Sequence, residues 1–192
     1  MSKSEKKQQS HEAILESAAV LLRKQGIQAS SVMDVMKGAG MTVGGFYSHF
    51  ESKEHLFAQT IRSAGSRMWD RLLGNAPGTT PRERALTVLR RYLSRSHRDH
   101  PEAGCILPNA AAEVAREGEP YRTALAEELG GFVDSFAEIL GDPKADREKS
   151  LALIALMFGA LSLSRAVAGT KLSNEFLKAG QALGEQALDA QS

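Results

Sequence analysis

Apolar residues recur at intervals of three and four along almost the whole 192-residue chain, and no segment alternates apolar and polar residues as a half-buried strand does. Ile14, Ala18, Leu21 and Leu22, for example, share one face of a helix that Gly26 can end. This pattern predicts an all-α protein with about nine helices. The predicted helices are one ending at Gly26 and the segments 31–39, 42–50, 53–73, 81–98, 104–117, 120–140, 145–168 and 173–189.

The charges of the chain are unevenly distributed. Residues 1–100 carry 16 Lys and Arg against 9 Asp and Glu, a net charge of +7, whereas residues 101–192 carry 8 against 14, a net charge of −6. A basic first half suggests a polyanionic partner such as nucleic acid. Two solvated faces of opposite sign explain the charge pattern equally well, so the charge alone leaves both interpretations open.

The chain has one cysteine, Cys105, which excludes an intrachain disulfide and fits a reducing compartment. The first residues, "MSKSEKKQQSHE", lack the apolar centre of a secretion signal. The longest apolar run, "LALIALMFGALSLS", is shorter than a membrane-spanning helix requires. We therefore expect a cytoplasmic protein that does not cross a membrane.

Residues 31–50 have the layout of a helix–turn–helix. Ser31 with Asp34 resembles a capping box at the start of the first helix, and Gly40 suits a turn position with positive φ. Thr42 can cap the second helix, which then begins with Gly44 and Gly45. In a helix–turn–helix, the first residues of the second helix meet the DNA in the major groove.

The glycine pair is the most informative part of that second helix. Each glycine in a helix costs roughly 1 kcal/mol relative to alanine, but it lets the backbone come close to bases or phosphates. Phe46 and Phe50 are four residues apart and are expected to point inward, whereas Tyr47 lies on another face. A buried aromatic corner would explain the two phenylalanines, but it would not explain the glycines.

The segment from Ala13 to Phe57 resembles the DNA-binding domain of the TetR family of bacterial repressors. The matching pieces are "AILESAAVLLRKQGIQASSV", "AGMTVGGFYSHF" and "SKEHLF", in the order and at the spacing of the family. Met36 departs from the family, which usually carries a small residue there, so a slightly different packing against Phe46 is expected. The resemblance implies DNA contacts from residues in and around the second helix: Ser31, Thr42, Val43, Gly44, Gly45, Tyr47, His49 and Lys53.

The same resemblance implies a second, helical domain for effector binding and dimerisation. We divide the chain into a DNA-binding domain (1–52) and an effector and dimerisation domain (53–192), with a further Gly/Pro-rich break at 75–81. The family implies a homodimer through about residues 145–189. One apolar stripe predicted for that contact comprises Leu153, Leu156, Met157, Ala160, Leu161 and Ser164. The alternative is that this stripe is the internal core of a single chain.

The effector site is assigned only loosely from the sequence. Its expected lining includes the aromatic residues Tyr92, Tyr121, Phe132 and Phe136, and the ligand is a small molecule of unknown identity. Cys105 stands at a predicted helix start, as does the reactive cysteine of some relatives, and a helix start favours a thiolate. The alternative is that Cys105 is simply a small buried residue.

Other chemistry has little support in the sequence. His97, His100 and Cys105 could gather a metal with the help of Asp99, but Pro101 interrupts them and no fourth ligand is evident, so no metal and no cofactor are expected. No phosphate-binding loop, nucleophile elbow or zinc-protease motif occurs, so we do not expect an enzyme. The sequence therefore predicts a TetR-type repressor that binds a near-palindromic operator as a homodimer and is released by a small effector or by modification of Cys105. The alternative is a helical ligand carrier or enzyme without DNA binding.

Overall fold

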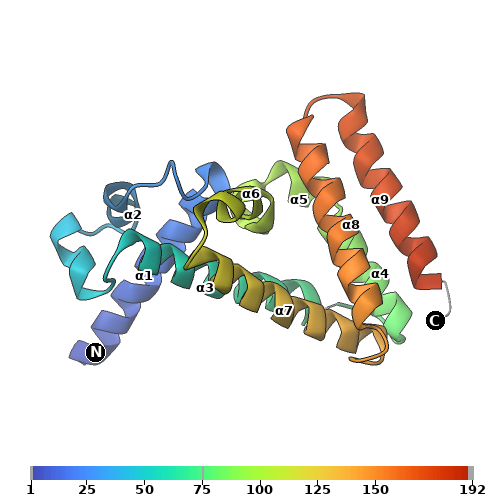
Figure 1. Cartoon of the computed structure of the whole chain (residues 1–192), viewed down its shortest axis with the longest axis horizontal. Helices are drawn as coiled ribbons and strands as arrows, with labels where there is room; N and C mark the ends of the chain where they lie inside the picture. The colour runs from blue at the N-terminus through green and yellow to red at the C-terminus, as the bar shows by residue number, and fades with distance from the viewer. Residues whose placement is uncertain (1, 75, 190–192) are drawn as a thin grey trace. The chain divides into compact units, whose positions relative to one another are not determined.

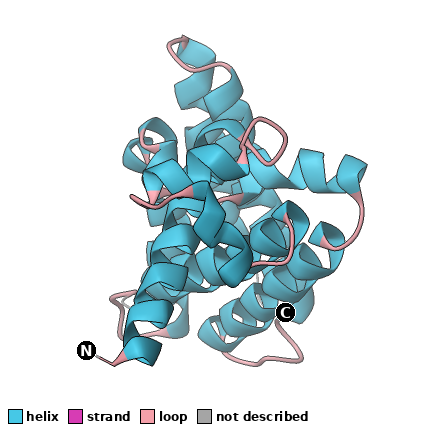
Figure 2. Cartoon of the chain, turned by 90° about the vertical axis from the view of Figure 1, so that its left-hand side faces the viewer, coloured by secondary structure: helices cyan, strands magenta, loops and turns pink. Residues whose placement is uncertain are grey.

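The computed structural model describes residues 2–74 and 76–189, and within these ranges the chain is all-helical (Figures 1 and 2). Residue 75, at the start of the predicted Gly/Pro-rich break, lies outside the described residues. The elements are α1 (Lys3–Gln25), α2 (Val32–Gly38), the 3₁₀ helix η1 (Val43–Ser48), α3 (Lys53–Leu73), α4 (Pro81–Tyr92), α5 (Arg95–Asp99), the 3₁₀ helix η2 (Pro101–Ala103), α6 (Leu107–Glu117), α7 (Tyr121–Leu140), α8 (Arg147–Ala166) and α9 (Lys171–Asp189).

Two predicted helices differ from the observed elements. The single helix expected over 81–98 is broken after Tyr92, because the Ser94 hydroxyl accepts a hydrogen bond from the His97 N–H at 3.1 Å and starts the separate helix α5. The second helix of the helix–turn–helix is the 3₁₀ helix η1, and Thr42 precedes it without a side-chain cap bond. Both differences depend on local hydrogen bonds that apolar periodicity does not report.

The chain forms two compact units. Unit 1 comprises Met1–Ser66 and Cys105–Glu128, and unit 2 comprises Arg67–Gly104 and Leu129–Ser192. Helices α3 and α7 each contribute one part to either unit. The bounds of these compact units differ from those of the predicted domains 1–52 and 53–192. Those domains were divided by expected function, and the division stays a prediction.

In unit 1, helices α1 and α2 cross closely. Ile14, Ala18 and Leu22 are fully buried on the inner face of α1. The Ser17 hydroxyl donates to the carbonyl of Val35 at 2.8 Å, and a Cβ on Gly38 would overlap that hydroxyl. The glycine therefore permits the close crossing that places the helix–turn–helix on α1.

Helix α6 is tied to the end of α1 in the same unit. The Glu113 carboxylate accepts a hydrogen bond from the Ile27 N–H at 2.5 Å. The Asn109 side chain donates to the carbonyl of Arg23, and Gln28 donates to Glu117 at 2.5 Å. These three bonds connect α6 to the last turn of α1 and to the loop that leads into the helix–turn–helix.

In unit 2, α8 and α9 lie side by side and α4 packs against both (Figure 1). The helices approach closely at glycines of α9, since a Cβ on Gly180 would lie 2.8 Å from Ala160 and one on Gly184 would lie 2.6 Å from Leu89. The buried hydroxyls of Ser164 and Ser173 each donate to the carbonyl of the other residue, at 2.8 and 2.7 Å. The inner faces of α8 and α9 are therefore fixed by close packing and paired polar groups.

This packing corrects the predicted dimer stripe. Leu153, Met157, Ala160, Leu161 and Ser164 are at most 8% exposed and form the core between α8 and its neighbours, so the alternative of an internal core face is right for them. The sixth residue of the predicted stripe, Leu156, is partly exposed and lies on the outer face of α8. The outer faces carry apolar and small residues at alternating spacings of four and three. These outer stripes are Ala152, Leu156, Gly159, Leu163 and Ala166 on α8, and Leu172, Phe176, Ala179 and Leu183 on α9.

Helix α8 is also long and apolar enough to cross a membrane by length and composition alone. Its mean hydropathy is 1.3, and 39% of the relevant window is buried inside the protein. The longest unbroken apolar run of the sequence is too short to span a membrane, so the sequence alone did not predict that the whole of α8 is apolar enough to do so. A core helix of a soluble protein meets the same criterion, and the close packing of α8 on α9 favours that interpretation.

Candidate nucleic-acid interface

The helix–turn–helix of unit 1 begins with a capped helix and a glycine turn. The Ser31 hydroxyl accepts a hydrogen bond from the Asp34 N–H at 3.0 Å, which caps α2 as predicted. Gly40 has φ +72°, in the left-handed region that favours glycine, and the Met41 N–H closes the turn on the Met36 carbonyl at 2.9 Å. The turn leads into η1, which packs against α2.

The aromatic residues of η1 and its exit divide by face, as predicted. Phe46 and Phe50 are 1% and 2% exposed and stack with ring centroids 5.8 Å apart. Tyr47, between them, is 77% exposed, and Val43 is 45% exposed. Single exposed apolar side chains are common on folded domains, so this exposure shows only that the outer face of η1 is uncovered by the chain itself. The buried pair anchors η1, while its outer face stays open.

Neither glycine of the pair is required by the fold. Gly44 and Gly45 have no positive φ, and a Cβ at Gly44 would meet nothing within 4 Å. A Cβ at Gly45 would meet only the Met36 terminal methyl at 3.9 Å, an ordinary contact. Met36 itself is fully buried beneath η1. Packing within the described chain therefore does not explain why either position is a glycine.

His49 lies partly buried at the exit of η1, beside α1. Its ring centroid is 5.9 Å from that of His11, which in turn stacks on Phe50 at 4.5 Å. Its Nδ1 atom is buried without a hydrogen-bond partner among the described residues. Burial, with the nearby His11 and Lys7, lowers the pKa of His49 below its usual 6.5.

Lys53 begins α3, as predicted, but it is turned toward the protein. Its Nζ lies 3.5 Å from the Gln28 carbonyl oxygen and 5.9 Å from the centre of the Phe57 ring. The side chain is partly exposed, and a long flexible lysine can exchange one weak bond for another. Thr42 is exposed and Ser31 is partly exposed. All eight predicted DNA-contacting residues are therefore exposed or partly exposed residues of unit 1.

Sequence reasoning missed three lysines beside this surface. A groove of about 610 Å³ runs between the start of α1 and the exit of η1 and is lined by Lys3, Ser4, Lys6, Lys7, Ser10, Ser48 and His49. The signal was present in the sequence, since positions 3, 6 and 7 share one helical face. It was passed over because the polar N-terminus has no apolar periodicity.

The predicted effector residues are core residues in this structure. In unit 2, Tyr92, Phe132 and Phe136 are 1–2% exposed, and Phe132 stacks on Trp69 with centroids 3.7 Å apart. Tyr121 belongs to unit 1, where burial and the nearby Glu54 and Glu117 raise its pKa to about 12. The structure therefore does not gather the four aromatic residues in one unit.

A polar cleft of about 260 Å³ lies in unit 2. It is lined by Met68, Leu72, Arg91, Ser94, Ser96, His97, His100, Ala103 and Gly104. The His97 ring donates from Nδ1 to the Tyr92 carbonyl at 2.8 Å, and burial lowers the pKa of His97 to about 4, with a further contribution from Arg165. The imidazole is therefore neutral at pH 7.

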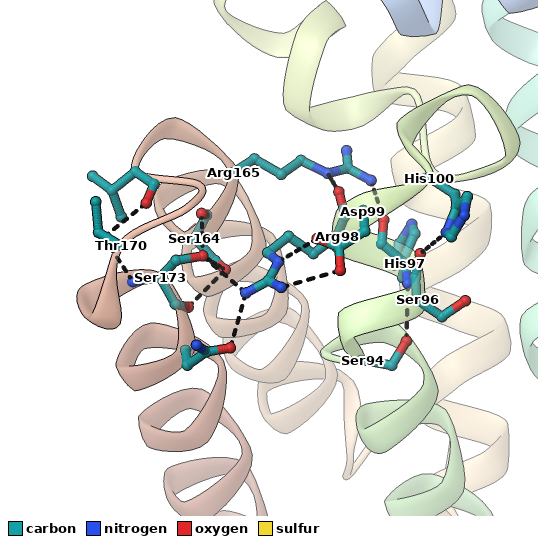
Figure 3. Close-up of polar contacts among 12 residues, drawn as sticks. Ser94, Ser96, His97, Arg98, Asp99, His100, Ser164, Arg165, Thr170 and Ser173 are labelled. Atoms are coloured by element: carbon teal, nitrogen blue, oxygen red, sulfur yellow. Dashed lines mark hydrogen bonds and ion pairs between the residues drawn. The ribbon is translucent and has the colours of Figure 1, made fainter.

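Two arginines hold α5, which forms one wall of that cleft, to the last two helices (Figure 3). Arg165 of α8 donates to the carbonyls of His97 and Arg98, at 2.5 and 3.3 Å. Arg98 reaches α9 and donates to Ser173 and Asn174 at 2.9 and 3.0 Å. Any displacement of α5 would therefore act on α8 and α9.

Cys105 precedes α6 in unit 1 and is 2% exposed. Its sulfur accepts a hydrogen bond from the Leu107 N–H at 3.4 Å, which agrees with a position at a helix start. His97 and His100 belong to the other unit. Among residues 2–74 and 76–189, no group of three or more His, Cys, Asp or Glu side chains is placed to hold a metal ion.

An exposed helix–turn–helix on an all-helical chain defines the architecture of a bacterial DNA-binding regulator. Family models agree with this architecture: "Bacterial regulatory proteins, tetR family" matches residues 14–60, and "Tetracyclin repressor-like, C-terminal domain" matches residues 81–179. Together the two models cover both the helix–turn–helix and more than half of the chain beyond it. The chain belongs to the TetR family.

Known relatives and structures are consistent with that membership. The HTH-type transcriptional repressor KstR of Rhodococcus jostii (strain RHA1) is 25% identical over 162 residues, which cover 84% of this chain and 68% of that protein. The repressor KstR2 of Mycobacterium tuberculosis is 39% identical over 49 residues, and the match spans only 24% of its length.

Two crystal structures show the same fold. A TetR transcriptional regulator from Chloroflexus aurantiacus J-10-FL superimposes with a TM-score of 0.79 at 22% identity, covering 97% of this chain and 98% of that one. The reduced form of E. coli NemR superimposes with a TM-score of 0.77 at 21% identity, covering 93% and 96%.

Proposed function

We propose that this chain is a cytoplasmic transcriptional repressor that binds a near-palindromic operator as a homodimer. The observation that carries the proposal is the bare surface of η1, where Gly44 and Gly45 serve no purpose within the fold and the exposed Tyr47 stands next to them. Glycine at the start of a recognition element lets unpaired backbone N–H groups approach the DNA. Relatives that carry the name of transcriptional repressor support the same function.

We further propose that the outer stripes of α8 and α9 form the dimer contact. Leu163, Leu172 and Leu183 are 50%, 47% and 55% exposed, and each stripe has the alternating four and three spacing of a helix–helix seam. Pairing both stripes with those of a second copy would bury them in a four-helix bundle. A two-fold dimer presents two recognition elements, which requires two half-sites in the operator.

The proposed release signal is a small molecule that binds the 260 Å³ cleft beside α5. The cleft includes Met68 and Leu72 of α3, the helix that begins at Lys53 directly after the helix–turn–helix. Its other wall, α5, is tied to α8 and α9 through Arg98 and Arg165. An effector that prefers a displaced α5 would change the dimer and with it the spacing of the two recognition elements.

Modification of Cys105 is a second proposed route to release. Cys105 lies two residues before α6, and α6 is bonded to the loop before the helix–turn–helix through Glu113 and to the last turn of α1 through Asn109. A bulky adduct on a residue that is 2% exposed would have to displace the start of α6. The alternative function, a ligand carrier or enzyme without DNA binding, would leave the exposed Tyr47 and the glycine pair unexplained.

The proposal is tested by DNA binding of the purified dimer to the intergenic DNA beside its own gene. Wild type should protect two symmetric half-sites from nuclease cleavage, and Tyr47→Ala should lose this protection while keeping the same melting temperature. The control is Met33→Ala, which removes another large exposed side chain of unit 1, 63% exposed on α2. Equal footprints for wild type and Tyr47→Ala would remove η1 from the interface, and no footprint for wild type on any genomic fragment would favour the alternative.

A further inference from the structure

The basic groove between α1 and η1 is a surface that the helix–turn–helix pattern does not include. Lys3, Lys6 and Lys7 line one side of it, and Ser48 and His49 line the other. All three lysines are exposed, and none of their ammonium groups has an ion-pair partner within the described part of the chain. The groove has no carboxylate in its lining. It therefore concentrates positive charge in a concave surface.

The acidic residues at the start of α1 are engaged elsewhere. The Glu5 carboxylate accepts a hydrogen bond from the Ser2 N–H at 2.7 Å, and the Ser2 hydroxyl accepts one from the Glu5 N–H at 3.1 Å, which completes a capping box. Glu12 accepts a bond from Gln8 at 2.8 Å. The capping box fixes the first turn of α1 as helix, so the three lysines are held on one face rather than carried on a loose tail.

We propose that this groove binds phosphate groups of the DNA backbone, directly beside the bases that η1 approaches. The proposal rests on the proposed function and extends its interface from η1 to the first two turns of α1. Three arguments support a phosphate. The charges are complementary, the groove adjoins the exposed Tyr47 side of η1 through Ser48 and His49, and lysine offers a flexible point charge that suits backbone rather than base recognition.

His49 makes the groove sensitive to protons. In the free protein His11 and Lys7 of α1 contribute to the lowered pKa of His49, and Lys3 and Lys6 line the same groove. His55, at the start of α3, packs edge-on against Phe50 and is hydrogen-bonded to Gln59 and to the Glu51 N–H. A bound phosphate would offset that repulsion and favour the charged imidazole. DNA binding should therefore take up protons, and affinity should rise as the pH falls toward 6.

The test measures how affinity depends on salt, using a fluorescent duplex of about 30 base pairs with arbitrary sequence, since phosphate contacts need no operator. The protein is the full chain with its tag removed. Lys6→Ala and Lys7→Ala each delete one charge from the groove. Lys24→Ala is the matched control, because Lys24 is an exposed lysine in the last turn of the same helix.

Each groove variant should flatten the plot of log affinity against log salt by about 0.9 for each phosphate that it no longer neutralises, and by about 1.8 when this happens in both heads of a dimer. The Lys24→Ala slope should equal that of wild type. His49→Gln should bind with the same affinity at about pH 6 and pH 7.5, whereas wild type binds more tightly at the lower pH.

The possible outcomes distinguish failure of the phosphate-binding groove from failure of the proposed repressor function. Slopes for Lys6→Ala and Lys7→Ala equal to the Lys24→Ala slope would overturn the groove, even if Tyr47→Ala still abolishes the operator footprint. Wild type without any salt-dependent DNA binding would overturn the groove and the repressor function together. A pH dependence that survives in His49→Gln would show that another group takes up the proton and would overturn the role of His49.

Discussion

The carboxylate of Glu113 accepts a hydrogen bond from the backbone N–H of Ile27, 86 positions away in the sequence. Ile27 is 2% exposed, and it lies between the end of α1 and the start of α2. A Cβ on the neighbouring Gly26 would overlap the same carboxylate, so the glycine leaves room for it. Helix α6 is thereby built into the same compact unit as the helix–turn–helix.

Replacing Glu113 with alanine should destabilise unit 1. The change leaves the Ile27 N–H without its acceptor, and removing a charge-assisted hydrogen bond of this kind costs on the order of 1–3 kcal/mol. Denaturant unfolding of the two variants provides the measurement. Glu117→Ala is the control, because its bond to Gln28 is exposed and its removal should cost about 0.5 kcal/mol or less. Equal stabilities would show that the Glu113 bond does not hold α6.

Replacing Gly44 with alanine should separate stability from DNA binding. The new Cβ meets nothing within 4 Å, so the fold should be unchanged or more stable by up to about 1 kcal/mol. The same methyl group would stand between the backbone and the DNA, and operator affinity should fall by about tenfold or more. Gly130→Ala on α7, where a Cβ also meets nothing, should stabilise the protein without changing DNA binding. Full affinity in Gly44→Ala would refute the close approach.

A charge on the outer stripe of α8 should dissociate the dimer. Leu163→Glu costs little in a single chain, because Leu163 is 50% exposed, but it would bury an unpaired carboxylate in the proposed contact. Sedimentation should show monomers at concentrations where wild type is dimeric. Leu151→Glu is a matched control, since Leu151 is 49% exposed on the same helix but lies outside the stripe. Dimers of unchanged strength in Leu163→Glu would place the contact elsewhere.

Acidification should destabilise the protein through His97. Its folded-state pKa of about 4 lies below the unfolded value near 6.5, so the unfolded chain binds the proton first. The stability from neutral His97 is complete above pH 6.5 and is lost as the pH falls toward 4, by on the order of 2–3 kcal/mol in all. Melting temperatures across that range should fall less steeply in His97→Asn than in wild type. His100→Asn, which changes an exposed histidine of the same segment, should follow wild type. Identical pH profiles for His97→Asn and wild type would contradict the assignment.

Cys105 gives a prediction with two distinct outcomes. If modification of Cys105 releases the DNA, an electrophile such as a quinone should dissociate the complex of wild-type protein with its operator. The complex of Cys105→Ser with the operator should stay intact. Because the sulfur is buried, the reaction should be slow compared with the binding of a cleft ligand. Equal release from both proteins, or an unmodified thiol in mass spectra of the treated dimer, would leave the cleft as the remaining route.

Features set by neighbouring residues could be predicted from the sequence. The cap at Ser31, the helix end at Gly26, the positive φ of Gly40 and the inward pair Phe46 and Phe50 are predicted correctly, because each depends on residues within a few positions, although the cap predicted at Thr42 is not formed. The resemblance to a known family then placed these pieces in a DNA-binding head.

Features set by distant contacts could not be predicted in the same way. Helix α8 is apolar around most of its circumference, so periodicity alone could not tell its inner face from its outer stripe, and all residues of the predicted dimer stripe except Leu156 are core residues. The effector aromatic residues were chosen by type, but in the core Phe132 stacks on Trp69 and Phe136 stacks on Phe132. The groove beside η1 could not be predicted, because the sequence does not show that the start of α1 and His49 lie close together in the fold.

The two glycines on the inner face of α9 have a consequence for how chains of this kind can diverge. Because Gly180 and Gly184 seat α9 directly against Ala160 and Leu89, a larger side chain at either position would force the helix outward. The outer residues of α8 and α9 are free of that constraint. If the outer stripes form the dimer contact as proposed, changes at Leu163, Leu172 or Leu183 would alter which protein of this fold the chain pairs with in one cell, while the packing beneath them stays the same.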